Sequence, residues 1–368
     1  MLDAARTLRP RGLSRRIGRA VVGLAALWGA TAAAGASQDA PPLSEIAEAS
    51  RVELGSAGVL YLYTAYLRTR VLPNRDDVVS ALVVIHGYPR DANRTLDAGA
   101  SAARRAGHAS DTVVVAPLFQ VAAPADKRCR YSGNPAAQLG DVLWSCASWL
   151  DGGLATGGGT TSFQALDKVV AGLRERWPRL RTITVAGFSA GAQFVQRYVG
   201  FARPPAGVHL RYVVSDPGTW LYFDQHRPAP QGGWTDCDSA SCRFAWRLVG
   251  ASADCPRPNQ WKYGTDGLPA VLGSSAREAR ARYAAADLAY LEGELDQGDG
   301  PGTYYGLLDK SCAAELQGPD RLRRGLAYAA YDGRFLSAGR PLTIVGGCAH
   351  DVTCVFPSKD ARRALFPR

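Results

Sequence analysis

The first candidate for a catalytic residue is a serine with a glycine two residues away on each side. The stretch 187–191 has the sequence Gly-Phe-Ser-Ala-Gly, which fits G-x-S-x-G with Ser189 at its centre. The apolar run 181–187 predicts a buried strand, and 192–199 predicts a helix with one apolar face. A strand, a tight turn and a helix around such a serine are typical of a nucleophile elbow, which lifts the hydroxyl above a sheet edge. Its glycines are needed because the serine backbone is strained and nearby side chains would clash.

A general base should follow the nucleophile in a chain of this kind. Three histidines do so: His209, His226 and His350. His209 opens a predicted strand and His226 lies in a long connection, whereas His350 comes just after the last predicted strand, 341–346. A loop at that place can bring an imidazole over Ser189. We therefore predict that His350 is the base and that activity falls at acidic pH, where the imidazole is protonated.

The acid that orients the imidazole should lie between these two residues, at the end of a strand. Asp296 follows the predicted strand 289–295, and Asp216 follows the predicted strand 210–215. We favour Asp296, because its strand immediately precedes the strand that carries the histidine. Asp216 is the alternative acid.

Backbone N–H groups should stabilise the negative charge that develops on a substrate oxygen. The elbow directs the N–H of Ala190 toward that charge, and a second donor should come from the loop after an earlier strand. The strand is 81–86, and Tyr88 is the predicted donor because Pro89 has no N–H. We expect His86 to be a structural member of this turn.

Short apolar runs alternate with helical segments along most of the chain. This pattern is typical of a mostly parallel sheet covered by helices on both faces, so the predicted fold class is doubly wound α/β. Segments 59–63 and 65–71 are expected to add antiparallel strands, Thr161 to cap a helix through about Leu173, and 320–330 to be helical. The predicted parallel strands are 81–86, 111–117, 181–187, 210–215, 289–295 and 341–346.

A long connection, 217–287, interrupts this rhythm before the acid-bearing strand. It contains three cysteines and four tryptophans, and a connection of this length often forms a lid or cap over a site. A surface loop without such a role is the alternative. The tryptophans could line an aromatic or sugar-binding cleft, although core packing is the more common role of this residue. The five candidates for this cleft are Trp220, Trp234 and Trp261 in the connection and Trp144 and Trp149 before it.

The first segment has the pattern of an export signal. Residues 1–19 are rich in arginine, 20–36 are apolar and small, and small residues before Ser37 predict cleavage there. This signal predicts a secreted or periplasmic location, and the tripeptide 14–16 resembles the start of a twin-arginine signal. An uncleaved anchor is the alternative. The predicted parts are a signal (1–36), a flexible leader (37–54) and one catalytic domain (55–368, with the cap at 217–287).

Composition excludes several classes of protein. The chain has 368 residues, of which 46% are hydrophobic and 21% charged, as expected for a chain with a real core and not for a disordered one. The net charge of +10 owes much to six arginines in the signal, and 37 basic and 32 acidic side chains remain beyond it. We therefore expect no nucleic-acid partner. We also expect no membrane span after signal cleavage, and a monomer.

Eight cysteines in an exported chain predict disulfides. There are 105 ways to pair them, and proximity in the sequence favours 129–146, 237–242 and 348–354, which leaves 255–312. A pair 348–354 would hold His350 in a tight loop. The chain has no C-x-x-C pair and no H-E-x-x-H motif, so we expect no metal.

The order Ser189, Asp296, His350 resembles that of the α/β-hydrolase superfamily. More narrowly, the chain resembles secreted α/β-hydrolases of bacteria and fungi that are distantly related to polyhydroxybutyrate depolymerases and feruloyl esterases. The resemblance covers roughly residues 55–357. Its other matching pieces are 85–87, 90–92, Trp144, Trp149, 162–163, 166–167, 187–191, 196–198, 261–264, 290–296 and 350–351.

The resemblance implies hydrolysis of a carboxylic ester, small or polymeric, by a secreted serine hydrolase that needs no cofactor. A serine peptidase or amidase with the same three residues is one alternative, because the chemistry serves both bonds. A binding protein on an inactive hydrolase scaffold is another, because fold does not determine function.

Overall fold

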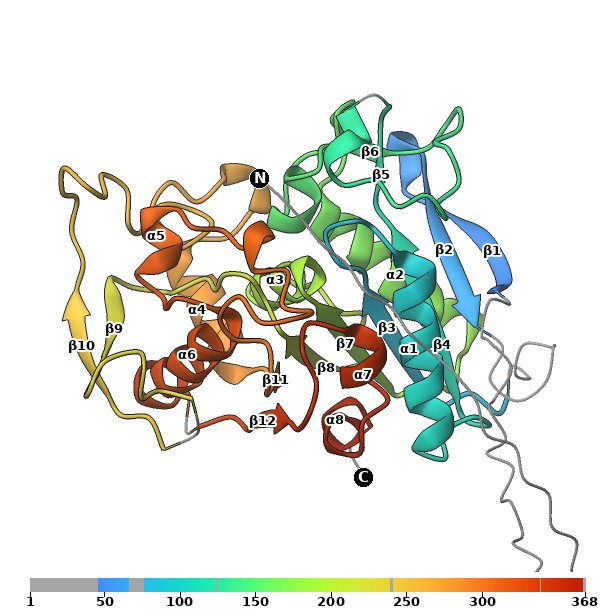
Figure 1. The fold of residues 1–368 in the computed structure, drawn as a ribbon. Helices are drawn as coiled ribbons and strands as arrows, with labels where there is room; N and C mark the ends of the chain where they lie inside the picture. The colour runs from blue at the N-terminus through green and yellow to red at the C-terminus, as the bar shows by residue number, and fades with distance from the viewer. Residues whose placement is uncertain (1–45, 66–75, 124, 239–240, 338, 367–368) are drawn as a thin grey trace, which may run out of the picture. The chain divides into compact units, whose positions relative to one another are not determined.

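The computed structural model describes residues 46–65, 76–123, 125–238, 241–337 and 339–366. The predicted signal and residues 66–71 of the predicted strand 65–71 lie outside these residues. Within them, a sheet of eight strands has the order β1-β2-β4-β3-β7-β8-β11-β12 (Figure 1). The strands are β1 (Ile46–Glu53), β2 (Val59–Ala65), β3 (Ser80–Ile85), β4 (Thr112–Leu118), β7 (Thr182–Phe188), β8 (His209–Ser215), β11 (Asp287–Gly293) and β12 (Leu342–Val345).

The sheet is parallel from β4 to β12, and antiparallel at the edge where β2 joins β1 and β4. The predicted mostly parallel α/β fold is therefore confirmed. Successive side chains of β3 point to opposite faces, as they must in a strand. Val83 and Ile85 join the core on one face, and Leu82 and Val84 join the core on the other.

Helices cover both faces of the sheet. On one face lie α2 (Ser162–Arg176), α3 (Ala190–Tyr198), α4 (Ala276–Ala285) and α6 (Arg321–Phe335). On the other lie α1 (Ala92–Arg105), α7 (Val352–Val355) and α8 (Lys359–Leu365), which stand close together in Figure 1. The predicted cap of α2 is present, since Thr161 and Gln164 form a capping box. In α6 the Asp320 side chain accepts the N–H of Arg323.

Short elements decorate this frame. They include the ribbon of β5 (Gln120–Val121) and β6 (Leu143–Trp144), and a hairpin of β9 (His226–Pro230) and β10 (Phe244–Leu248). The rest are α5 (Cys312–Glu315) and 3-10 turns at Gly55–Ala57, Ala125–Arg128, Ser148–Asp151, Ala270–Leu272 and Tyr305–Leu307. No helix of the described residues is long and apolar enough to cross a membrane.

One feature differs from the sequence-based expectations. The predicted leader 37–54 contains β1, which pairs with β2 through its backbone. The tryptophans Trp144, Trp149 and Trp220 are fully buried in the core, which is the more common role of this residue. The expected disulfides are present at all four pairs, Cys129–Cys146, Cys237–Cys242, Cys255–Cys312 and Cys348–Cys354.

Candidate active site

Ser189 occupies the turn between β7 and α3 with a strained backbone, since its φ is 58°. Close contacts explain the glycines around it. A Cβ at Gly187 would lie 2.1 Å from the carbonyl oxygen of Gly191, and a Cβ at Gly191 would lie 2.2 Å from that of Ile85. Only glycine fits both positions, so the turn needs both to hold Ser189 above the sheet.

His350 lies in the loop between β12 and α7, and its Nε2 is 2.8 Å from Ser189 Oγ. The disulfide Cys348–Cys354 brackets this loop. The backbone N–H of His350 donates to the carbonyl of Gly302 at 3.2 Å, and the Phe188 ring packs beside the imidazole. The disulfide, this backbone hydrogen bond and the Phe188 ring therefore hold His350 in position.

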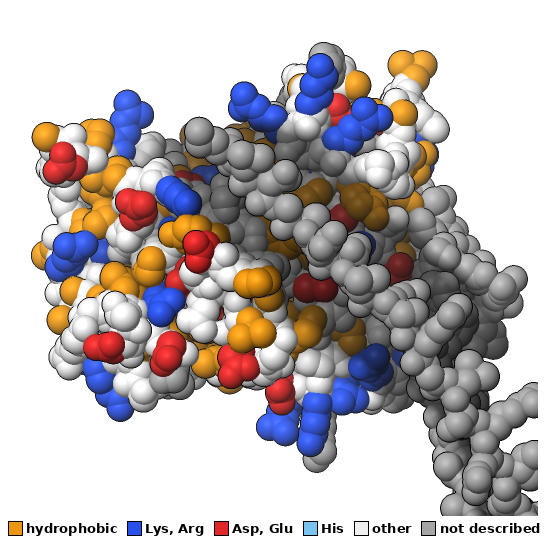
Figure 2. Space-filling view, in the orientation of Figure 1, with side chains coloured by type: hydrophobic (Ala, Val, Ile, Leu, Met, Phe, Trp, Pro, Cys, Tyr) orange, Lys and Arg blue, Asp and Glu red, His pale blue; other side chains and the backbone are white. Residues whose placement is uncertain are grey.

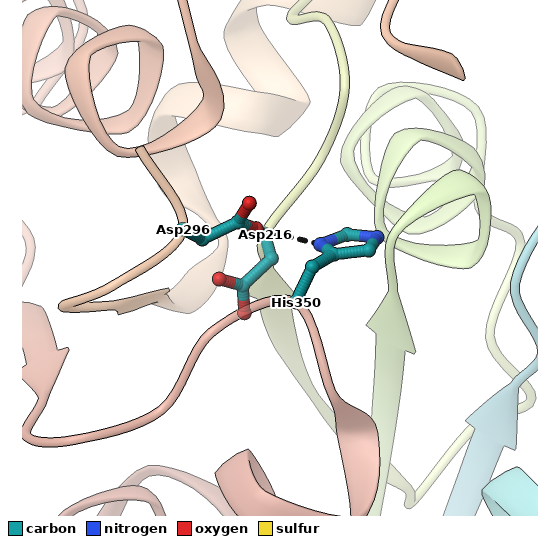
Figure 3. A group of neighbouring side chains, drawn as sticks. All are labelled: Asp216, Asp296 and His350. Atoms are coloured by element: carbon teal, nitrogen blue, oxygen red, sulfur yellow. Dashed lines mark hydrogen bonds and ion pairs between the residues drawn. The ribbon is translucent and has the colours of Figure 1, made fainter. Parts of the chain in front are cut away.

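Asp296 is the acid that reaches this histidine. Its Oδ2 is 2.6 Å from His350 Nδ1, the contact drawn in Figure 3. It lies in the turn three residues after β11 ends. On its other oxygen, Oδ1, Asp296 accepts a hydrogen bond from Arg321 Nη1 at 3.2 Å.

Asp216, the alternative acid, is buried next to this pair (Figure 3). One ligand-type atom each of Asp216, Asp296 and His350 lies within 4.8 Å of the other two. The Asp216 carboxylate accepts hydrogen bonds from two other donors, the N–H of Gly293 at 2.6 Å and the hydroxyl of Ser215 at 2.6 Å. Of the two aspartates, Asp296 is therefore the one hydrogen-bonded to the imidazole.

Burial shifts the pKa of each of these groups toward its neutral form. Burial, assisted by the positive charge of Arg321, lowers the pKa of His350 to about 3. Burial raises the pKa of Asp216 and that of Asp296 to about 7. An imidazole with a lowered pKa is neutral from pH 5 to 8 and can accept the proton of Ser189. A general base with this lowered pKa would lose its function at a lower pH than an ordinary histidine.

The two predicted N–H donors, of Ala190 and Tyr88, belong to residues that line the same cavity as Ser189. Ala190 is the first residue of α3, where the N–H has no carbonyl of its own helix as a partner. The loop that carries Tyr88 is anchored from below. His86 Nε2 accepts the N–H of Phe119 at 3.3 Å, so its Nδ1 carries the proton and donates to the carbonyl of Gly87 at 3.0 Å. His86 is therefore structural here.

Above Ser189 and His350 is a cavity of about 500 Å³. Tyr304, Leu307, Leu308 and Asp309 contribute to its wall from the segment after the acid, and Tyr304 and Leu307 are more than half exposed. The predicted cap contributes two residues, Gly218 and Lys262. The remaining lining residues are Gly87, Tyr88, Pro89, Asp91, Arg94, Leu150, Phe188, Ser189, Ala190, Gln193, Arg321, His350 and Val352.

This lining corrects one of the alternatives left open by the sequence. None of the five tryptophans proposed for an aromatic cleft lines the cavity. Trp149 and Trp220 instead stack on Phe119 and Tyr328 inside the core. On the described part of the face drawn in Figure 2, acidic, basic and hydrophobic side chains are interspersed.

Sequence reasoning missed three contributors to the site: Arg321, Gln193 and the segment 304–309. Arg321 begins α6 and Gln193 lies one turn into α3, so both positions belong to predicted helices. No motif marks them, because the contacts with Asp296 and with the cavity come from the packing of distant segments. The available signal for the segment 304–309 was the pair of large apolar residues Tyr304 and Leu307 in a loop, since exposed apolar residues near a site often contact a ligand.

The strand order, the helices on both faces and the serine turn after a central strand define the α/β-hydrolase fold. The solved structures with a similar fold include two bacterial hydrolases. A poly(3-hydroxybutyrate) depolymerase from Bordetella parapertussis is 20% identical, with a TM-score of 0.55 over 88% of this chain and 93% of its own. A poly(aspartic acid) hydrolase from Sphingomonas is 18% identical, with a TM-score of 0.56 over 87% and 98%. No family model matches the sequence, and no curated protein does.

Proposed function

We propose that this protein is a serine hydrolase that cleaves carboxylic esters, with Ser189 as nucleophile, His350 as general base and Asp296 as the orienting acid. The observation that carries the proposal is the continuous chain of contacts from Asp296 Oδ2 through the imidazole to Ser189 Oγ, at 2.6 and 2.8 Å. Ser189 and His350 line a cavity large enough for a small ester or the end of a polymer. The α/β-hydrolase fold supports the assignment as an analogy.

The reaction proceeds in two steps through an acyl-enzyme. His350 Nε2 takes the proton of Ser189 while Oγ bonds to the ester carbonyl carbon, and Asp296 stabilises the imidazolium that forms. The N–H groups of Ala190 and Tyr88 donate to the oxyanion, each contributing about 3 kcal/mol to transition-state stabilisation. The carbon–oxygen bond to the alcohol then breaks, and the alcohol leaves with the proton held by His350. Water, deprotonated by His350, repeats the attack and releases the acid with Ser189 restored.

We further propose that the protein is exported by residues 1–36 and acts outside the cytoplasm as one catalytic domain that includes β1. Four disulfides among the described residues support this, because such bonds persist in oxidising compartments. Mass spectrometry of the mature protein would locate its first residue. A mature chain that still begins at Met1 would contradict the signal.

A covalent serine probe tests the proposed nucleophile. A fluorophosphonate should label the oxidised protein, and the labelled peptide should contain Ser189. The His350→Gln variant should label far more slowly, because the serine is then not activated. Parallel assays with p-nitrophenyl esters and the matching p-nitroanilides separate an esterase from an amidase. Labelling at another residue, or cleavage of anilides but not esters, would overturn the proposal.

A further inference from the structure

Gln193 has an amide group whose orientation is fixed by its neighbours. It lies four residues after Ser189, one turn along α3, and lines the cavity above the serine. Its Oε1 accepts hydrogen bonds from Thr219 Oγ1 at 2.7 Å and from Arg197 Nη2 at 3.3 Å. Both acceptor sites of this oxygen are therefore used.

Arg197 decides which end of the amide is the oxygen, because a guanidinium can only donate. This arginine is fully buried and held in place by the Asp151 carboxylate at 3.0 Å and the carbonyl of Leu150 at 3.2 Å. The amide nitrogen of Gln193 must therefore be the end that points away from Arg197.

The amide nitrogen lies next to the cavity wall, and the proposed ester hydrolysis does not use it. A Cβ added at Gly218, which lines the cavity, would lie 3.2 Å from Gln193 Nε2. Within the part of the chain that the structure describes, this nitrogen makes no hydrogen bond. A half-buried donor without a protein partner, oriented by a buried ion pair, is suited to bind an acceptor atom of a ligand.

The charges around the cavity indicate what kind of acceptor fits. Each basic side chain that lines it stands beside a carboxylate. Arg94 contacts Asp351 at 2.8 Å, Lys262 lies 3.9 Å from Asp309, and Arg321 lies 3.2 Å from Asp296. A ligand carboxylate would meet these acids as well as the bases, so a neutral acceptor is favoured over an anion.

We propose that Gln193 is a specificity-determining residue, and that its Nε2 donates a hydrogen bond to a second, neutral oxygen of the substrate. The inference rests on the proposed ester hydrolysis at Ser189. The substrate class is then an ester that carries a carbonyl or hydroxyl oxygen away from the scissile group, on either its acid or its alcohol part. A plain alkyl chain would cover the donor without pairing it, and a site that leaves a polar group unpaired discriminates against such a chain.

The test compares substrates that differ only in that oxygen. One arm uses p-nitrophenyl hexanoate and its 3-oxo, 4-oxo and 5-oxo derivatives. The other uses propyl and 2-oxopropyl hexanoate. In each arm the readout is the ratio of kcat/KM for the oxo ester to that for the plain ester. The wild type should favour at least one oxo ester by about fivefold or more, the worth of one net hydrogen bond.

Two variants remove the donor in different ways. Gln193→Glu keeps an oxygen for Arg197 and replaces the nitrogen by an acceptor, and Gln193→Met removes both polar ends. Both should lose the preference for the oxo ester, whatever happens to their overall rate. Gln231→Met is the matched control, because Gln231 is exposed in the loop between β9 and β10 and does not line the cavity. Its ratio should equal that of the wild type.

The outcomes separate this inference from the proposed function. Ester turnover that depends on Ser189, with no oxo preference in either arm, overturns the inference alone. A preference that survives in both Gln193 variants also overturns it. Ester turnover that is unchanged in Ser189→Ala, or absent from the wild type, removes the proposed function and this inference with it.

Discussion

Arg321 and His350 meet opposite oxygens of the same carboxylate, that of Asp296. The guanidinium lies 3.2 Å from Oδ1 and the imidazole 2.6 Å from Oδ2. Arg321 also donates to the carbonyl of Thr303, so its position is fixed by two acceptors. Asp296 is thus held in place by Arg321, whose positive charge also lowers the pKa of His350.

Removing this cation should change the pH dependence of the enzyme. Arg321 lowers the pKa of His350 and that of Asp296, so Arg321→Gln should raise both. Because His350 must be neutral to act, the acidic limb of kcat/KM should move to higher pH, by about 1 unit. Arg321→Lys keeps the charge and should retain most of the wild-type profile. Arg323→Gln, on the same helix but paired with Asp320, is the control. An unmoved limb in Arg321→Gln would show that Arg321 has only a structural role.

The two candidate acids can be separated by matched substitutions. Asp296→Asn should lower kcat/KM by about 10⁴ at neutral pH, because the imidazole loses its orienting partner. Asp216→Asn should cost less than about tenfold, since Asp216 bonds to Gly293 and Ser215 and not to His350. Equal losses in both variants would assign the acid's role to the pair.

The disulfide around His350 should matter for turnover more than for folding alone. Replacing Cys348 and Cys354 by serine frees the loop, and a small displacement of the imidazole should lower kcat by about 10²-fold. The control replaces Cys237 and Cys242, which close a loop of similar size away from the cavity. That variant loses comparable loop-closure stabilisation but should keep its kcat. Equal loss of kcat in the two double variants would contradict a positioning role.

Glu292 should make the protein less stable as the pH rises. Its carboxyl is fully buried on β11, and neither oxygen has a hydrogen-bond partner among the described residues. Burial raises its pKa well above the usual value. The folded protein keeps a proton that the unfolded chain releases above about pH 4.3, so the free energy of unfolding falls with rising pH.

Glu292→Gln removes this proton linkage. The variant should therefore gain Tm relative to the wild type at pH 8 and differ little from it at pH 4. Thermal unfolding at the two pH values measures the effect. A wild type that loses as much Tm between pH 4 and 8 as the variant does would contradict it.

The serine turn was predictable because its cause is local. The glycines at 187 and 191, the apolar strand before them and the helix after them are all written in adjacent residues. The choice between Asp216 and Asp296 was not settled by the same reasoning, because both follow parallel strands that end at one edge of the sheet. The hydrogen bond that His350 Nδ1 donates to Asp296 distinguishes them.

The residues that shape the cavity depend on contacts between distant parts of the chain. Gln193 faces the cavity because Arg197 and Thr219 hold its oxygen, and Thr219 comes from the connection after β8. The segment 304–309 was not predicted to contribute, whereas the connection 217–287 was given that role by its length. The length of a connection does not show which of its residues reach the cavity. Trp220, for example, packs against Tyr328 in the core.

Hydrolysis of p-nitrophenyl butyrate by the oxidised mature protein, measured beside Ser189→Ala, tests most directly whether Ser189 is the nucleophile. We expect turnover by the wild type and a loss of at least about 10³-fold in kcat/KM in the variant, with unchanged Tm. Longer acyl chains in the same assay would give the depth of the cavity. Equal turnover by both proteins, or none by the wild type on esters of any length, would contradict the assignment of Ser189 as the nucleophile of an ester hydrolase.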